Sequence, residues 1–283
     1  MLKDKVAVIY GAGGAVGGAV ARAFAREGAR LFLTGRHLAQ IGAVAKEVAP
    51  AGGSVETAEV DALDEQAVDR HLQSVTEKAG RVDVSFNAIG IPNTTLQGVP
   101  LVELDAEQFI LPIATYARSY FLTARLAARR MVEQRSGVIM TVTSIPSRTG
   151  IPLLGGVWPA MSAVEALTRG LSAELASHGI RVVGLRPQGM SETGTIKEVF
   201  GLHAKAWGIS WEQFQELIAG RTHTRRLSTL AEMANVAAFL ASDEASALTG
   251  TVATLGMRTS TTGAFATTDR FVSGADSVCI SDA

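Results

Sequence analysis

Cysteine, histidine and tyrosine are all scarce in this chain of 283 residues. The single cysteine, Cys279, has no partner for an internal disulfide and cannot supply a cluster of thiolate ligands. The five histidines are scattered without metal-ligand spacing, so we expect no metal site. A formal net charge of −1 gives no electrostatic basis for binding nucleic acid or an anionic membrane surface, and we expect neither as a partner.

Long apolar runs are also missing, because no stretch approaches the length that a membrane span needs. The chain begins Met1-Leu-Lys-Asp-Lys and passes directly into an apolar strand, which leaves no room for a signal peptide. We therefore expect a cytoplasmic protein. The 47% of hydrophobic residues is enough for a sizeable core, and the length suits a single α/β domain.

Short apolar runs alternate with amphipathic stretches along most of the chain. This alternation predicts an α/β fold, a Rossmann-type doubly wound parallel sheet in a single domain, with ligands at the carboxyl ends of the strands. Helices are expected at residues 17–27, 38–49, 65–78, 106–134, 160–177 and 231–241, and strands at 6–10, 30–34, 55–60, 82–87, 137–143, 181–185 and 251–255.

A glycine-rich turn follows the first expected strand and opens the first expected helix. Such a turn lets the backbone approach a pyrophosphate closely, and the helix N-terminus offers N–H groups to the anion. The alternative is a tight strand–helix connection that binds nothing. We favour dinucleotide binding by the residues of the turn, which are Gly11, Gly13, Gly14, Val16 and Gly17.

The second expected strand runs into Gly35-Arg36, where enzymes that prefer NAD commonly carry an acid for the ribose 2′-hydroxyl. No acid stands here, and Arg36 can pair with a 2′-phosphate instead. The sequence thus favours NADP(H) over NAD, although a solvated loop charge is the plainer interpretation of Arg36.

The stretch from Gly137 to Ser144 reads as a buried strand that ends in a hydroxyl, and the helical run with Val157 and Met161 follows. This resembles the active-site segment of the short-chain dehydrogenase/reductase family, in which a serine precedes a Tyr-x-x-x-Lys pair by the same spacing. Laid on that pattern, Ser144 is kept, but Val157 stands at the tyrosine position and Met161 at the lysine position. No shift of register restores the pair, because the tyrosines are Tyr10, Tyr116 and Tyr120 and the lysines after them are Lys197 and Lys205.

The resemblance extends from about residue 3 to residue 256 and implies further site residues. In relatives, the matching positions contact the adenine, pack beside the cofactor ribose, and frame the nicotinamide. These positions are Asp61 and Ala62 for the adenine, Asn87, Ala88 and Gly90 for the ribose, and Pro187, Gln188 and Gly189 for the nicotinamide. The middle glycine of the family turn is Ala15 here.

Tyr116 occupies the position at which the family carries an active-site asparagine. One interpretation is that Tyr116 fills apolar space beside Val157 and Met161, since a buried tyrosine often makes only one polar contact. The other interpretation is that the Tyr116 hydroxyl replaces the family tyrosine as the acid, from the opposite wall of the pocket. We take Ser144 and Tyr116 as the candidate catalytic residues.

Two segments lie outside the common pattern. An insertion between Thr193 and Leu230 carries Phe200, Trp207, Trp211 and Phe214. It corresponds to a substrate lid in relatives, at about 190–230, although a small helical core would explain the aromatics nearly as well. His203 and His223 of this insertion are expected to be surface or core residues rather than catalytic ones. Residues 257–283 form a Ser/Thr-rich C-terminal tail beyond the domain of residues 1–256.

Three functions are consistent with a chain that keeps the cofactor motifs of the family but lacks its Tyr-x-x-x-Lys pair. The first is an NADP(H)-dependent oxidoreductase with altered acid–base groups, acting on a carbonyl, enone or imine. The second is a non-redox enzyme, a cyclase or isomerase, in the same pocket, and the third is a catalytically silent cofactor binder. The resemblance also implies a homodimer or homotetramer, with close helix approach at small residues: Ala124, Ala127, Ala128, Ala163, Ala166 and Gly170.

Overall fold

A seven-stranded, all-parallel sheet forms the centre of the computed structural model, which describes residues 1–51, 54–148 and 150–256. The strand order is β3-β2-β1-β4-β5-β6-β7, so the chain winds outward in both directions from β1. The strands are β1 (Val6–Tyr10), β2 (Arg30–Gly35), β3 (Val55–Glu59), β4 (Val84–Asn87), β5 (Gly137–Val142), β6 (Ile180–Arg186) and β7 (Thr251–Thr254). The Rossmann-type fold expected from the sequence is confirmed.

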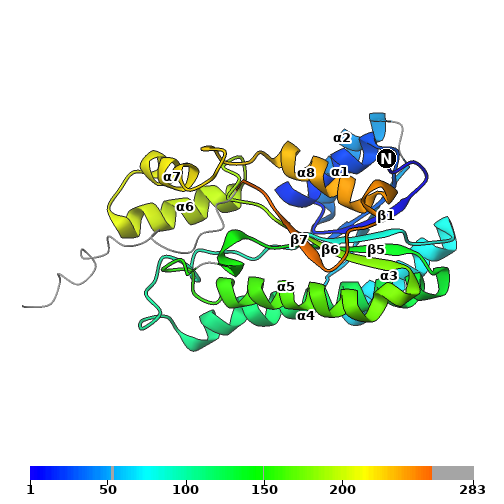
Figure 1. Ribbon diagram of the computed structural model, residues 1–283, viewed down its shortest axis with the longest axis horizontal. Coiled ribbons are helices and arrows are strands. Elements are labelled where there is room, and N and C mark those ends of the chain that lie inside the picture. The colour runs from blue at the N-terminus through cyan, green and yellow to red at the C-terminus, as the bar shows by residue number, and fades with distance from the viewer. Residues whose placement is uncertain (52–53, 149, 257–283) are drawn as a thin grey trace, which may run out of the picture.

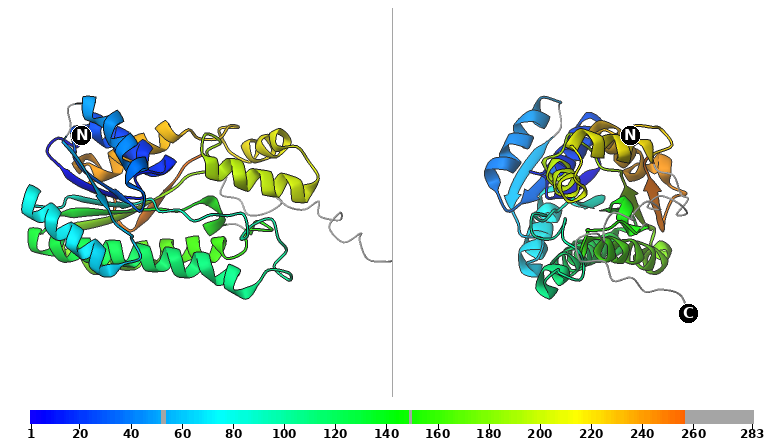
Figure 2. Two further views of the ribbon diagram at one scale, coloured as in Figure 1. Left: turned by 180° about the vertical axis from the view of Figure 1, so that it is seen from behind. Right: turned by 90° about the vertical axis from the view of Figure 1, so that its left-hand side faces the viewer.

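Helices cover both faces of the sheet (Figure 1). Helices α1, α2 and α8 lie on one face, and α3, α4 and α5 on the other, as both side views show (Figure 2). The helices are α1 (Ala15–Arg26), α2 (Leu38–Val48), α3 (Glu65–Ala79), α4 (Ala106–Gln134), α5 (Val157–Leu175), α6 (Gly194–Trp207), α7 (Trp211–Gly220) and α8 (Leu230–Ala241). Short 3₁₀ turns span Ala49–Ala51, Ile145–Ser147, Ala176–His178 and Asp243–Ala245.

The core is divided by the sheet according to the two-residue period of the strands. In β1, Ala7 and Ile9 face the α1 and α8 side, while Val6, Val8 and Tyr10 face the α3 and α4 side. Because both faces are covered, β1 is buried at every position, as a central parallel strand should be.

Helix α5 begins at Val157, three residues before the expected start at residue 160. Pro159 therefore stands in the first turn, where the missing proline N–H would have no intrahelical partner in any case. The earlier start places Val157 and Met161 one turn apart on the helix.

The insertion before α8 forms a small helical unit beyond the carboxyl end of β6 (Figure 1). Phe200 and Phe214 pack edge to face at 5.1 Å, and Trp207 lies 5.5 Å from Phe214. Ser210 caps α7 through a capping box with Gln213, which fixes where this helix begins.

None of the helices in the described part of the chain has the length and apolarity that a bilayer crossing requires. The expected C-terminal tail lies outside the described residues.

Candidate active site

A cavity of about 330 Å³ lies at the carboxyl edge of the sheet. Its walls come from the glycine-rich turn, from the segments that follow β4, β5 and β6, and from α4, α5, α6 and α7. Among the residues predicted from the sequence, those that line the cavity are Gly14, Val16, Ala88, Gly90, Tyr116, Ser144, Val157, Met161, Pro187, Gln188 and Gly189. The parallel sheet therefore brings most of the predicted site together, as its topology requires.

Three glycines of the glycine-rich turn have no room for a side chain. Gly11 has a φ of +73°, and a Cβ there would lie 2.7 Å from the carbonyl oxygen of Ala88. A Cβ at Gly13 would lie 2.8 Å from Cβ of Gln40, and one at Gly17 would collide with the carbonyl oxygen of Gly11. Helix α1 then begins at the cavity with no acidic residue in its first turn. This arrangement fits an anionic pyrophosphate.

Arg36 and Asp61 follow the neighbouring strands β2 and β3, whose last residues pair Gly35 with Glu59. Arg36 is exposed, which leaves its guanidinium available to a ligand. The carboxylate of Asp61 accepts a hydrogen bond of 2.9 Å from the backbone N–H of Leu63 and so shapes the turn before α3. Ala62, which belongs to this turn, is buried.

Asn87 uses its side chain to hold the segment that follows β4. Its Nδ2 donates to the hydroxyl of Thr123 at 3.1 Å, and its Oδ1 accepts from the backbone N–H of Ile89 at 3.0 Å. The hydroxyl oxygen of Tyr120 lies 3.1 Å from the carbonyl oxygen of Asn87. Asn87 is itself buried, and its hydrogen bonds hold Ala88, Ile89 and Gly90 in the cavity wall.

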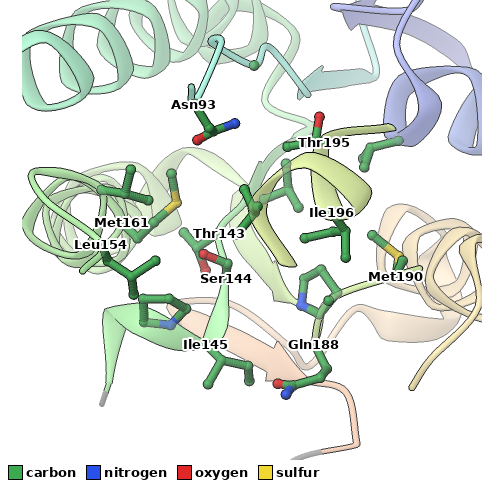
Figure 3. A pocket seen from close by; sticks show the side chains of 18 of the residues that line it. Asn93, Thr143, Ser144, Ile145, Leu154, Met161, Gln188, Met190, Thr195 and Ile196 are labelled. Carbon is green, nitrogen blue, oxygen red and sulfur yellow. The ribbon is translucent and has the colours of Figure 1, made fainter. Parts of the chain in front are cut away.

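Ser144 lies at the centre of the cavity (Figure 3). It begins the 3₁₀ turn after β5, and its hydroxyl makes no capping hydrogen bond to that turn. Leu154 and Met161 lie on one side of Ser144, and Ile196 and Met190 lie on the other (Figure 3). The walls nearest to the serine hydroxyl are therefore largely apolar.

Two tyrosines of α4 differ in their surroundings. Tyr120 is fully buried, and its hydroxyl donates to the carbonyl oxygen of Val142 at 2.7 Å, which ties α4 to β5. Tyr116 lines the cavity one turn earlier. Burial raises the pKa of Tyr116 to about 12, and a hydrogen bond with the backbone of Ile91 offsets only part of this rise. Tyr116 therefore keeps its proton at neutral pH and is a weak acid.

A buried ion pair that no sequence pattern predicted lies one turn beyond Met161. Glu165 is 2% exposed and accepts hydrogen bonds from Arg186 Nε at 2.6 Å and Nη2 at 2.9 Å. Arg148 adds a third at 3.0 Å, and Ser147 a fourth at 2.5 Å. Although burial raises the pKa of Glu165, these hydrogen bonds outweigh it and hold the pKa below its usual range. Glu165 is thus an ionised structural group and not a proton donor.

His203 was expected at the surface or in the core, and the structure places it in the core and also in the cavity wall. Its ring stacks on Phe214 with 5.6 Å between centroids, and its Nε2 lies 3.4 Å from Oε1 of Gln97. Two aromatics of the insertion, Phe200 and Phe214, form a small core and also line the cavity.

Known proteins resemble this chain over most of its length. A family model described as enoyl-(acyl carrier protein) reductase matches residues 11–255. An uncharacterised oxidoreductase of Bacillus subtilis (strain 168), YxbG, is 32% identical over 249 residues, which are 88% of each chain.

Solved structures also match this chain over most of its length. The structure of an NAD⁺-bound xylitol dehydrogenase aligns with a TM-score of 0.85 at 24% identity, covering 91% of this chain and 99% of that one, which shows the shared fold. An actinorhodin polyketide ketoreductase with NADPH aligns with a TM-score of 0.81 at 25% identity, covering 90% of this chain and 97% of that one. The family match and the aligned relative together show that the chain belongs to the short-chain dehydrogenase/reductase family and is an oxidoreductase of that type.

Proposed function

We propose that this protein is an NADP(H)-dependent oxidoreductase whose active site lacks the tyrosine and lysine of its family, and that it acts on a small carbonyl, enone or imine compound. The observation that carries the proposal is the wall around Ser144. Val157 and Met161 line the cavity at the two positions that match the family pair, and neither side chain holds a transferable proton. The non-redox and catalytically silent alternatives gain no support from the relatives, which are named as oxidoreductases and reductases.

The residues around the cavity suit a nicotinamide dinucleotide. Gly11, Gly13 and Gly17 give the close backbone approach that a pyrophosphate needs, and the start of α1 offers it N–H groups. Pro187 to Gly189 line the cavity beside Ser144, where the nicotinamide would lie. The carboxamide oxygen of Gln188 is buried without a hydrogen-bond partner in the described part of the chain, so it can accept one from the cofactor amide. A bound NADPH supplies hydride to the substrate.

The chain's own contribution to reduction is orientation and hydrogen bonding. The Ser144 hydroxyl donates to negative charge that develops on the substrate, because a hydroxyl without a neighbouring base stays protonated near neutral pH. Losing a positioned general acid typically costs about 10²–10⁴-fold in rate. An iminium needs no proton at all, and an activated enone needs none in the hydride step. Such substrates avoid much of this cost, and we propose that they are preferred over simple ketones.

We expect NADPH to bind more tightly than NADH, by about 10–100-fold, because Arg36 can form a charge-assisted hydrogen bond with the 2′-phosphate. Arg36→Ala should remove this preference while leaving NADH binding unchanged, as measured by calorimetric titration. Arg129→Ala, an exposed arginine on α4 at the other face of the sheet, is the matched control and should keep the preference. Equal affinity of the wild type for both cofactors would rule out the proposed role of Arg36.

We expect Tyr116→Phe to lower kcat by about tenfold, the value of one neutral hydrogen bond, with no change in the pH dependence of kcat between pH 6 and 9. The reason is the pKa of Tyr116, which burial raises to about 12, so the hydroxyl can donate a hydrogen bond but transfers its proton poorly. The substitution removes only the hydroxyl and keeps the ring. Full retention of kcat would make Tyr116 a packing residue, and a fall of about 10²-fold or more would indicate true acid catalysis.

The insertion, which contains α6 and α7, is proposed to act as the substrate lid. Thr195, Ile196, Val199 and Phe200 of α6 line the cavity, and their helix lies beyond the carboxyl end of β6. The small core around Phe214 gives the insertion its own packing, so it can hold these side chains over the substrate as one unit.

We propose a homodimer or homotetramer built on α4 and α5. Ala124, Ala127 and Ala128 cannot contribute as expected, because they are already buried in this chain's own core. Small exposed positions remain on α5 at Ala163, Ala166 and Gly170, and α4 and α5 also expose Ile110, Leu111, Phe121 and Trp158. Covering such apolar surface favours association.

Light scattering at micromolar concentration should therefore give at least twice the chain mass, and Ala163→Arg should reduce it by blocking close helix approach. Glu174→Arg, at an exposed position nearer the end of the same helix, is the control for added charge. A monomeric wild type would contradict the proposed assembly.

A further inference from the structure

Three polar side chains form a connected row in the otherwise apolar cavity wall. Asn93 and Gln97 come from the segment after β4, and His203 comes from α6. All three line the cavity and are at most 6% exposed. Apolar side chains form much of the remaining wall: Leu154, Met161, Ile196, Val199, Phe200 and Ile218.

The hydrogen bonds of this row have a fixed direction. Asn93 Nδ2 donates to the carbonyl oxygen of Ile91 at 3.1 Å, and a carbonyl oxygen can only accept. The amide of Asn93 is thereby oriented, so its Oδ1 accepts from Gln97 Nε2 at 2.6 Å. Gln97 is oriented in turn, and its Oε1 is left to face His203 Nε2 at 3.4 Å. His203 Nε2 must therefore carry the proton and donate.

This direction leaves the other nitrogen of His203 as a bare acceptor. A neutral imidazole carries one proton, so Nδ1 presents a lone pair. Nδ1 is buried and has no hydrogen-bond partner among the residues that the structure describes. Burial lowers the pKa of His203 to about 4, so the ring stays neutral at pH 7 and does not satisfy Nδ1 by taking a second proton.

The ring is also held in place. His203 stacks on Phe214 with an interplanar angle of 27°, and Gln97 contacts its Nε2 edge. A buried acceptor without a partner is costly, and a ligand that supplies a donor recovers that cost. The same acceptor discriminates against a ligand of equal shape that lacks the donor.

We propose that His203 is a specificity-determining residue, and that its Nδ1 accepts a hydrogen bond from a hydroxyl or N–H group on a substrate whose skeleton is otherwise apolar. This rests on the proposed function only in taking the cavity as the substrate site. The substrate class is then a largely apolar molecule that carries its reducible group toward Ser144 and a hydrogen-bond donor at the end of the molecule that meets α6.

The test uses binding and not turnover, so that a failure of the proposed reduction would leave it unaffected. The probes are 2-naphthol, which carries a donor, and 2-methoxynaphthalene, which keeps the skeleton and the oxygen but has no donor. Both are titrated into the wild-type chain by calorimetry, with and without NADPH. We expect 2-naphthol to bind about fivefold to tenfold more tightly, the effect of one neutral hydrogen bond at a buried acceptor.

Two variants assign this preference to His203. His203→Phe keeps a flat ring on Phe214 and should bring the two affinities within about twofold of each other, since the acceptor is gone. His223→Phe makes the same change at an exposed histidine of the same insertion and should keep the full preference. Equal binding of both probes by the wild type overturns the proposal whether or not the variant folds. An unchanged preference in a folded His203→Phe also overturns it.

Discussion

Glu165→Leu is expected to lower the free energy of unfolding by about 3–5 kcal/mol, the usual cost of removing one partner from a buried ion pair. Arg186 is 8% exposed, and its Nε and Nη2 both donate to Glu165. Leucine has a similar volume but accepts no hydrogen bond, so the Arg186 charge would remain buried without its carboxylate. Arg186 Nη1 also donates to the hydroxyl of Thr254, but this neutral group cannot replace the negative charge of the lost carboxylate. Chemical denaturation with urea measures the effect.

Glu174→Leu is the matched control, because Glu174 is exposed on the same helix and its loss should cost less than about 0.5 kcal/mol. The pKa of Glu165 is lower in the folded chain than its usual value of 4.5, so its contribution is present above that pH and is lost as the pH falls. The difference between the two variants should therefore shrink in acid. Equal losses for both variants near neutral pH would show that the Glu165–Arg186 pair does not stabilise this fold.

Much of the fold could be predicted because it depends on local periodicity and on one topological rule. Helix α4 has the predicted bounds, since Asp105 caps its start and the apolar pattern continues unbroken to Gln134. The glycine-rich turn was predictable because its glycines lie between a strand and a helix. Parallel winding then brings the turn, Ser144 and Pro187 to one edge of the sheet.

The parts that could not be predicted depend on pairings between distant segments. Glu165 meets Arg186 across 21 positions, and His203 meets Gln97 across 106. Neither pairing leaves a periodic signal in the sequence, and the side chains acquire their roles only when α5 and α6 close over the strand ends. The same reason explains why the prediction of a subunit contact at Ala124, Ala127 and Ala128 was wrong. Their small size suits helix packing, but only the fold shows that this packing is internal.

The apolar character of the wall beside Ser144 has the largest consequence for activity. Installing the family residues as Val157→Tyr with Met161→Lys should raise kcat/KM for a simple ketone by about 10²-fold, because a positioned general acid contributes that much or more. Both positions line a cavity of about 330 Å³, which offers space for the larger tyrosine. They lie one turn apart on α5, the spacing at which side chains share a helix face. The variant with Val157→Phe and Met161→Lys is the control, because it adds the same bulk and charge without a hydroxyl.

The most direct test of the account is the steady-state reduction of cyclohexanone by NADPH in the wild type and these two double variants, with NADPH binding measured in all three. We expect slow reduction by the wild type, a rise of about 10²-fold with Val157→Tyr and Met161→Lys, and no rise in the phenylalanine control. If all three bind NADPH and the wild type already reduces the ketone about as fast as the expected rate of the tyrosine variant, a proton donor already operates beside Ser144. That result would contradict the claim that this active site works without one.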